Sequence, residues 1–264
     1  MIAIDLSGKT ILMTGALGAI AEHMVRRLGE AGATLALTDI KAEEAAQRTL
    51  DEWKIPRASY SYFAADIADA DAVERLVEQA FERWPALDTV LWHAGGCGLH
   101  PFATTSAAEY ERIFRFNYFA QTYLARATLA QWTKHGIAGH LIFTSSYVAR
   151  MPHTKIPAYA SAKAALENFA RCLALEYAAT GIRVNVVLPG NAAAGSSLKV
   201  LNRMRLTGNS CCGCRWAGAT ARSQSRTRSC FCVRRSPAKL TGKCSARTTA
   251  GGSATGYENR SGPL

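Results

Sequence analysis

Short apolar runs alternate along this chain with longer segments in which apolar residues recur every three to four positions. The alternation extends from Thr10 to Leu188 and is typical of βαβ units that build a parallel sheet. The short runs predict six strands, at Thr10–Thr14, Thr34–Thr38, Ser59–Ala64, Thr89–Trp92, His140–Thr144 and Arg183–Leu188. The longer segments predict helices at Glu43–Trp53, Ala72–Trp84, Glu109–Trp132 and Ala158–Ala179. Right-handed crossovers would place these helices on both faces, so we predict a doubly wound α/β sheet.

The first predicted strand leads into a glycine-containing turn and then an amphipathic helix. The turn reads Thr-Gly-Ala-Leu-Gly-Ala-Ile-Ala over residues 14–21. A turn of this kind brings backbone N–H groups and a helix N-terminus to a phosphate, so it predicts a Rossmann-type dinucleotide site. The residues expected to line it are Gly15, Leu17, Gly18, Ala19 and Ile20. A tight turn without a ligand is the alternative that this motif alone leaves open.

An acidic residue, Asp39, ends the second strand about twenty residues after the turn. A carboxylate there accepts hydrogen bonds from the adenosine ribose and repels a 2′-phosphate. Lys41 is close, but the turn itself holds no Lys or Arg, so the sequence favours NAD over NADP. Asp39 is also a candidate N-cap of the next helix.

Four polar residues, Asn117, Ser146, Tyr159 and Lys163, follow in the order S-x12-Y-x3-K with the Asn upstream. Tyr and Lys four residues apart share one face of a helix, so their head groups can converge. An ammonium beside a phenol stabilises the phenolate, and we expect Lys163 to lower the pKa of Tyr159 for acid–base catalysis. Ser145 is the neighbouring alternative to Ser146, and Asn117 alone is more often a helix-surface amide.

Together with the glycine turn and Asp39, this set resembles the Ser-Tyr-Lys-Asn tetrad of the short-chain dehydrogenase/reductase family. The resemblance covers about residues 5–198. It departs from the family at the glycine pattern TGxxxGxG, because positions 19 and 21 are Ala and Gly18 is displaced by one. Residues 92–95 read Trp-His-Ala-Gly instead of Asn-Asn-Ala-Gly, which suggests that His93 compensates structurally for a lost amide. Ala194 stands where the family often has a Thr that contacts the carboxamide of the cofactor.

The resemblance implies a hydride transfer between NAD(H) and a secondary alcohol or ketone. Tyr159 would exchange a proton with the substrate oxygen, Ser146 would bond that oxygen, and Lys163 would hold the nicotinamide ribose. Asn117 would anchor a water leading from Lys163 to solvent. The implied cofactor contacts also include Asp66, Ile67, Ala94, Gly95, Pro189 and Gly190. The family usually assembles as dimers or tetramers through helices that correspond here to Glu109–Trp132 and Ala158–Ala179.

The regular pattern stops after Asn202, which changes the interpretation of the net charge. The chain of 264 residues has a formal net charge of +11. Lys+Arg and Asp+Glu are equal in number, 19 each, over residues 1–200, whereas residues 201–264 hold 12 basic residues and only Glu258 as an acid. Six of the eight Cys also lie in that tail, and the two others suit packing in a cytoplasmic protein. We therefore predict one Rossmann-type catalytic domain over 1–199 and an irregular basic tail over 200–264.

Three other functions are weighed against a dehydrogenase. A non-catalytic dinucleotide-binding protein would use the same fold, but the complete tetrad argues against it. Nucleic-acid binding through the tail would rest on charge alone, because no recognised fold or aromatic platform accompanies it. Zinc is not expected, since the tail's CCGC and CFC clusters lack paired CxxC spacing, and no apolar run is long enough for a membrane span. A polar and cationic pocket lip, formed by His100, Tyr147, Arg150, His153 and Lys155, would suit a hydroxylated or anionic small molecule. Solvated loop residues without a ligand are the alternative that the sequence leaves open.

The composition of the tail predicts an out-of-frame translation from about Val200 onward. No Leu, Ile, Val or Met occurs between Thr207 and Cys232, and the bias toward Arg, Ser, Cys, Gly and Thr is typical of GC-rich DNA translated in the wrong frame. Regrouped degenerate codons of residues 211–217 can encode Leu-Arg-Val-Pro-Leu-Gly. Those of 224–232 and 241–245 can encode Ile-Ala-Asn-Ala-Val-Leu-Phe-Leu and Gly-Gln-Val-Leu, in the order that the family resemblance predicts.

Overall fold

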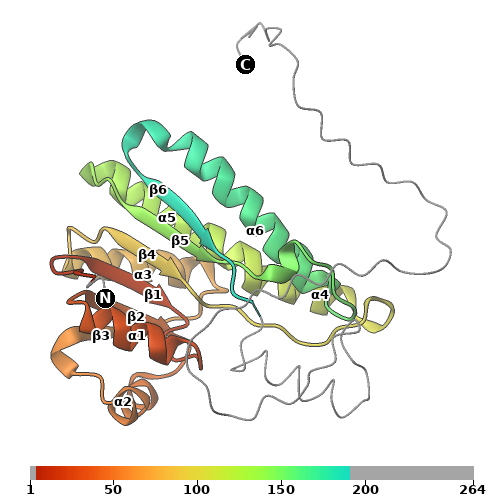
Figure 1. Ribbon diagram of the computed structural model, residues 1–264, viewed down its shortest axis with the longest axis horizontal. Coiled ribbons are helices and arrows are strands. Elements are labelled where there is room, and N and C mark those ends of the chain that lie inside the picture. The colour runs from red at the N-terminus through yellow and green to blue at the C-terminus, as the bar shows by residue number, and fades with distance from the viewer. Residues whose placement is uncertain (1–3, 191–264) are drawn as a thin grey trace, which may run out of the picture. The chain divides into compact units, whose positions relative to one another are not determined.

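The structure, a computed structural model, describes residues 4–190 and is built on one parallel sheet (Figure 1). Its strands lie in the order β3-β2-β1-β4-β5-β6. Their bounds are β1 Thr10–Thr14, β2 Thr34–Asp39, β3 Tyr60–Ala64, β4 Thr89–Trp92, β5 His140–Thr144 and β6 Arg183–Val187. The strand order reverses between β1 and β4, and in such sheets ligands bind beside the carboxyl ends of the strands at this switch point.

Helices connect successive strands and cover both faces of the sheet. Their bounds are α1 Ala21–Glu30, α2 Glu43–Glu52, α3 Ala70–Arg83, α4 Ala107–Phe114, α5 Ala120–His135 and α6 Pro157–Glu176. Short helical turns are η1 Arg57–Ser59, η2 Phe102–Thr104, η3 Arg115–Phe119, η4 Tyr147–Ala149 and η5 Ala178–Thr180. The predicted α/β fold with a doubly wound parallel sheet is therefore confirmed.

Two apolar cores, one on each side of the sheet, follow from the alternation of side chains along each strand. Leu12 and Phe143 belong to the core that contains α3, α5 and α6, whereas Ile11 and Met13 belong to the core that contains α1 and α2. Burial on both faces explains the continuous apolar runs of the central strands β1 and β4. The two cores fix the strand ends on which the candidate site is built.

The predicted helix Glu109–Trp132 is not one regular helix. It consists of α4, the π-helical turn η3 and α5. In η3 the backbone hydrogen bonds span five residues instead of four, so the ladder holds one additional residue. The turn carries Asn117, which is only 1% exposed, so the alternative that this Asn is a helix-surface amide is wrong.

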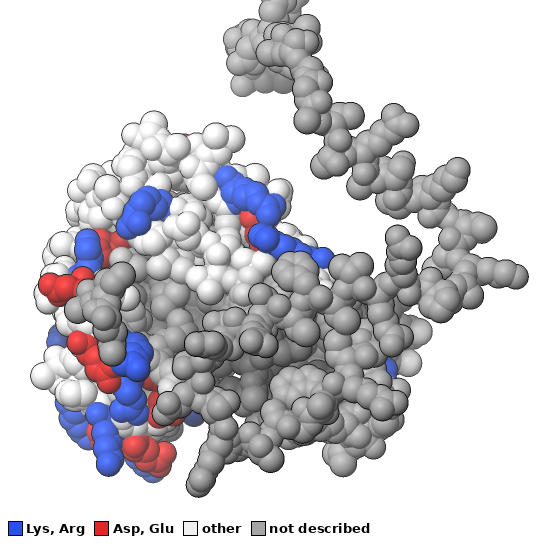
Figure 2. All heavy atoms as spheres, in the orientation of Figure 1, with Lys and Arg blue, Asp and Glu red and all other residues white. Residues whose placement is uncertain are grey.

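Charge is mixed on the described residues of the face that Figure 2 shows. Figure 2 shows acidic and basic side chains interspersed on the face in view, without a large region of one sign. The predicted basic tail, and Ala194 with it, lie outside the described residues. Within residues 4–190, no helix is long and apolar enough to cross a membrane.

Candidate active site

The glycine turn after β1 is closed by its own backbone and requires Gly15. This residue has φ +65°, and a Cβ there would lie 2.7 Å from Cα of Ala94. The N–H of Gly18 donates to the carbonyl of Gly15 (3.2 Å), and the N–H of Ala21 donates to that of Gly18 (3.0 Å). No side chain caps the start of α1 at Ile20. The turn thus passes close to the end of β4 and presents the uncapped beginning of a helix.

Asp39, at the end of β2, contacts this turn directly. Its Oδ2 accepts a hydrogen bond from the N–H of Leu17 (3.2 Å), and its Oδ1 accepts one from the N–H of Ile40 (2.9 Å). The N-cap of α2 is Ala42, so the alternative in which Asp39 caps that helix is wrong. A carboxylate at the end of β2 is therefore fixed against the glycine turn.

Asp66 and Ile67 follow the end of β3, the next strand in the sheet. The exposed Asp66 accepts a hydrogen bond from the N–H of Ala68 at 2.9 Å, and Ile67 is 6% exposed. The ends of β1, β2 and β3 thus carry the glycine turn, Asp39 and Asp66 in succession, because neighbouring parallel strands end at one edge.

The end of β4 is stabilised by Thr14 and Trp92. The hydroxyl of Thr14 accepts hydrogen bonds from the N–H groups of His93 (3.3 Å) and Ala94 (3.2 Å). The indole N–H of Trp92 donates to the carbonyl of Ala94 (3.0 Å). The side chain of His93 does not supply the expected compensation, because its buried Nδ1 has no hydrogen-bond partner among the described residues. Burial, together with the charge of Lys163, lowers the pKa of His93.

The side chain of Asn117 is oriented by three hydrogen bonds, one that it accepts and two that it donates. Its Oδ1 accepts from the N–H of Gly96 (3.1 Å), while its Nδ2 donates to the carbonyls of Gly96 (3.1 Å) and Ile113 (3.0 Å). A Cβ on Gly95 would lie 3.2 Å from both Oδ1 of Asn117 and Nζ of Lys163. Gly95 therefore lies against both polar groups, which the tetrad hypothesis expects to act together.

A residue that the sequence analysis did not select, Gln121, contacts the backbone of Asn117. Its Nε2 donates to the carbonyl oxygen of Asn117 at 2.9 Å, and its Oε1 is buried without a partner among the described residues. The sequence signal for it was an amide one helical turn after Asn117. Its complete burial is seen only in the structure.

Ser146, Tyr159 and Lys163 lie together where β5 ends and α6 begins. Nζ of Lys163 donates to the carbonyl of Thr144 at 2.9 Å and lies 5.9 Å from the centroid of the Tyr159 ring. The side chain of Ser146 hydrogen-bonds that of Tyr159. Ser146 and Lys163 are 8% and 3% exposed. The structure thus brings together the serine, the phenol and the amine that the motif predicts.

Burial shifts the pKa values of these groups more than their mutual charges do. Desolvation raises the pKa of Tyr159 to about 12, although the hydrogen bond from Ser146 acts in the opposite direction. Desolvation lowers the pKa of Lys163 to about 7. The expected lowering of the Tyr159 pKa is therefore not observed, since a lysine that is only about half protonated at neutral pH stabilises a phenolate less than a full positive charge does.

A cysteine that the sequence analysis treated as packing also lies at this centre. Cys97, in the segment after β4, interacts electrostatically with both Tyr159 and Lys163. Burial raises the pKa of its thiol to about 11. The thiol is thus neutral at ordinary pH and adds no charge next to the phenol.

The segment after β6 lies beside the turn that contains Ser146. The carbonyl of Pro189 accepts from the N–H of Tyr147 (3.1 Å), and that of Val187 accepts from the N–H of Ser145 (2.8 Å). Pro189 thereby lies beside the turn that contains Ser146.

The five residues of the predicted pocket lip do not behave as one group. The rings of Tyr147 and His153 pack edge to face at 5.2 Å, and the N–H of His100 donates to the carbonyl of Lys155 (2.6 Å). Arg150 instead binds Glu167 on α6. The lip is therefore held by contacts within the chain.

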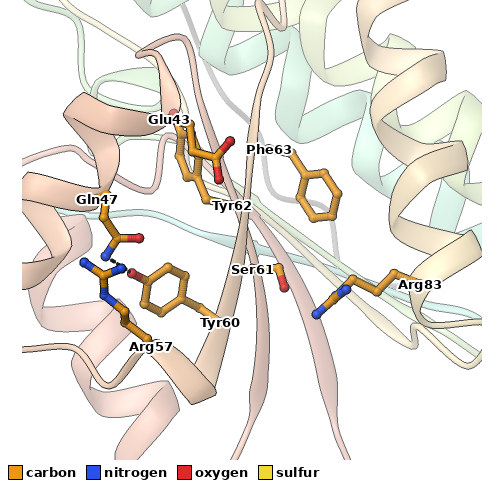
Figure 3. Close-up of a pocket in the computed structure, with 8 residues that line it drawn as sticks. All are labelled: Glu43, Gln47, Arg57, Tyr60, Ser61, Tyr62, Phe63 and Arg83. Carbon is orange, nitrogen blue, oxygen red and sulfur yellow. Dashed lines mark hydrogen bonds between the residues drawn. The ribbon is translucent and has the colours of Figure 1, made fainter.

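A separate pocket of about 350 Å³ lies at the opposite edge of the sheet, along β3 (Figure 3). Tyr60, Arg57 and Arg83 are among its lining residues, and it includes no predicted site residue. Arg57 is already paired with Asp51 at 2.7 Å, and Gln47 donates to the hydroxyl of Tyr60 at 2.8 Å. The pocket therefore lies apart from the centre at α6 and shares no residue with it.

A doubly wound sheet with a glycine turn after β1 and a Ser-Tyr-Lys centre after β5 defines a nucleotide-dependent oxidoreductase. Comparison with known proteins gives the family: residues 9–203 match the short chain dehydrogenase family. The chain belongs to this family, whose members use NAD or NADP and act on alcohol or ketone groups.

Two relatives illustrate the similarity. A versicolorin reductase of Emericella nidulans is 33% identical over 186 residues, which cover 70% of this chain and 69% of the relative. A glucose 1-dehydrogenase of Gluconobacter oxydans is 32% identical over 184 residues, covering 70% and 69%. Among solved structures, a dehydrogenase/reductase from Sinorhizobium meliloti has a TM-score of 0.66 at 30% identity, covering 73% of this chain and 75% of that one.

Proposed function

We propose that this chain interconverts a secondary alcohol and a ketone on a small, polar substrate and uses NAD(H) as the cofactor. The observation that carries the proposal is the convergence of Ser146, Tyr159 and Lys163 beside Asn117, on the same sheet edge as the glycine turn. A hydrogen-bonded phenol and a buried amine on one helix face form an acid–base pair that can serve a carbonyl or hydroxyl oxygen.

Each residue of the centre has a role that follows from its contacts. The phenol of Tyr159 stays protonated at neutral pH, since burial raises its pKa to about 12, and it is therefore ready to donate a proton to a carbonyl oxygen. Ser146, which bonds the phenol, would donate to the same substrate oxygen. Lys163 can accept or release a proton near neutral pH, because burial lowers its pKa to about 7. Asn117 fixes the segment 95–96 against the lysine.

The residues at the other strand ends fit a nicotinamide dinucleotide. Gly15 lets the turn pass close to Ala94, and the uncapped start of α1 suits a pyrophosphate. Asp39 would accept from the adenosine ribose, Asp66 and Ile67 would meet the adenine, and Pro189 and Gly190 would lie beneath the nicotinamide. When bound, this cofactor supplies the hydride chemistry, and the protein supplies position and electrostatics.

The preference for NAD rests on the charge of Asp39. A 2′-phosphate placed at the end of β2 would meet the carboxylate that already receives the N–H groups of Leu17 and Ile40. Lys41 is exposed and is the one basic residue close to this strand end in the sequence. The proposal of a polar substrate rests on the cationic lip residues, of which Arg150 is exposed and Lys155 is half-buried.

The experiment compares the unmodified full chain with Tyr159→Phe. We expect the substitution to lower turnover of secondary alcohols about 10²–10⁴-fold while NAD affinity, measured by calorimetry, stays nearly unchanged, because only the acidic proton is removed. Tyr177→Phe, at the far end of α6, is the matched control and should keep full turnover.

Normal turnover in Tyr159→Phe would overturn the acid–base assignment. NAD binding by the unmodified chain without turnover of any alcohol or ketone would instead favour the non-catalytic dinucleotide-binding alternative. A loss of binding on raising the salt concentration, for DNA or RNA added to the same protein, would point to the basic tail.

A further inference from the structure

Glu167 is a buried acid on α6 that the proposed mechanism does not use. It lies one helical turn after Lys163 and two turns after Tyr159, and it is only 4% exposed. Burying a carboxylate is costly unless charged or hydrogen-bonding partners surround it. Its partners therefore indicate what this residue does.

Three side chains converge on the Glu167 carboxylate. The hydroxyl of Ser145 donates to Oε1 (3.3 Å) and is also within hydrogen-bond distance of the carbonyl of Lys163 (3.2 Å). Nε of Arg150 donates to Oε2 at 2.9 Å. Arg171, one turn further along α6, donates to Oε2 at 3.4 Å. Glu167 thus holds both ends of the segment 145–150, which we call the serine turn.

The backbone conformation of the serine turn connects this anchor to the reacting centre. Ser146 is extended, with φ −158° and ψ 151°. Successive side chains of an extended backbone point to opposite sides, so Ser145 and Ser146 face in opposite directions. Ser145 bonds Glu167 and Ser146 bonds Tyr159. Fixing the first hydroxyl therefore fixes the direction in which the second one points.

We propose that Glu167 is a positioning residue of the active site, which holds the serine turn on α6 through Ser145 and Arg150 so that Ser146 stays aligned with Tyr159. This inference rests on the proposed function for its kinetic consequence. It also assigns Ser145: the residue next to the catalytic serine serves as the anchor of the turn, while Ser146 faces the substrate.

The test needs a measurement at Tyr159 that does not depend on turnover. All tyrosines are replaced with 3-fluorotyrosine in the full chain, and ¹⁹F NMR follows the ionisation of residue 159, whose signal is assigned as the one missing from Tyr159→Phe. Fluorine lowers the pKa of the phenol, which brings its titration into a pH range in which the protein stays folded. The titratable groups that face this phenol are Cys97 after β4, Tyr147 of η4 and Lys163 of α6.

Glu167→Ala and Ser145→Ala should each raise the apparent pKa of residue 159, because a displaced Ser146 no longer stabilises the phenolate. Glu167→Gln should not raise this pKa, since its amide oxygen still accepts from Ser145 and the loss of charge acts only downward. Removal of the Glu167 charge by itself would lower the phenol pKa, so a rise distinguishes lost alignment from lost charge. Glu176→Ala, an exposed acid at the end of the same helix, is the matched control and should leave the titration unchanged.

Turnover provides the second measurement. Glu167→Ala and Ser145→Ala should lower kcat about 10-fold or more and leave KM for NAD within about 2-fold, since the reacting groups are misaligned but the cofactor contacts are intact. Glu167→Gln should recover most of kcat. A merely structural role of Glu167 would lower the urea midpoint of unfolding, but it would not lower kcat selectively in the Ala variants and restore it in Glu167→Gln.

The proposal is overturned if residue 159 titrates as in the unmodified chain in every folded variant among Glu167→Ala and Ser145→Ala. If Glu167→Ala does not fold, Ser145→Ala alone decides, because it removes one hydroxyl and no charge. If the unmodified chain turns over no alcohol or ketone, the proposed function fails, and the ¹⁹F titration still decides whether Glu167 positions Ser146.

Discussion

Replacement of Lys163 by Met should change how the stability of this protein depends on pH. Lys163 is fully buried, and desolvation lowers its pKa from 10.5 to about 7. Met has a side chain of similar length without a titratable group, so it removes the proton equilibrium and keeps most of the volume. The hydrogen bond from Nζ to the carbonyl of Thr144 is lost at every pH, so it shifts the free energy of unfolding by a constant and does not change its pH dependence.

The magnitude follows from the two pKa values of Lys163. Between pH 7 and pH 9 the unfolded chain keeps the proton of Lys163, while the folded chain progressively releases it. Stability rises with pH where the unfolded state binds more protons, with a limiting slope of about 1.4 kcal/mol per pH unit. Because the folded group is half titrated near pH 7, the gain up to pH 9 is about 2 kcal/mol. Cys97, whose pKa burial raises to about 11, is present in both chains, so its titration cancels from the difference between them.

The assay is urea unfolding of the full chain and of Lys163→Met at several pH values from 7 to 9. We expect the free energy of unfolding of the unmodified chain to rise by about 2 kcal/mol relative to that of Lys163→Met over this range. Parallel pH profiles would refute the reasoning, since they would mean that Lys163 has the same proton affinity in the folded and unfolded chains.

Three further predictions concern other parts of the chain. Gly15→Ala should lower the free energy of unfolding by about 3 kcal/mol, because φ is +65° and the new Cβ would lie 2.7 Å from Cα of Ala94; an unchanged urea midpoint would contradict this. Asp39→Ala combined with Ile40→Arg, at a position 70% exposed, should shift calorimetric affinity from NAD toward NADP, and tighter binding of NADP by the unmodified chain would reject the role of Asp39. Sequencing the gene around codon 200 should find a single-base insertion or deletion relative to an open frame, and an intact frame would end the frameshift hypothesis.

Strand positions could be predicted closely because each strand is a short apolar run bounded by polar residues. β1, β4 and β5 match their predicted bounds, and the other three differ by one residue at one end. The family comparison confirms the class of enzyme that the motifs indicated. Both results depend on local sequence signals, which are strongest where a strand is buried on both faces.

The turn that contains Asn117 could not be predicted, because helical periodicity does not distinguish one additional residue within a long apolar segment. The pKa of Tyr159 was expected to move downward from the presence of Lys163, and the burial of both groups, which reverses the balance, is a property of the packed core. Glu167 had a signal that was not used: an acid four residues after Lys163, on the face that α6 buries. Its partners Ser145 and Arg150 are brought to it by the fold.

In the π-helical turn η3, regular helical hydrogen bonding and the orientation of the Asn117 amide exclude each other. A ladder with one residue fewer between Arg115 and Phe119 would let α4 and α5 join as a regular helix, with shorter and better aligned hydrogen bonds. The deletion would also rotate α4 and the residues of η3 that precede the deleted position by about 100° relative to α5, since a helix turns through that angle at each residue. The side chain of Asn117 would then lose its hydrogen bonds to the backbone of Gly96. The turn η3 thus gives up regular helical hydrogen bonds and gains the orientation of Asn117, as π-helical turns often do at functional sites.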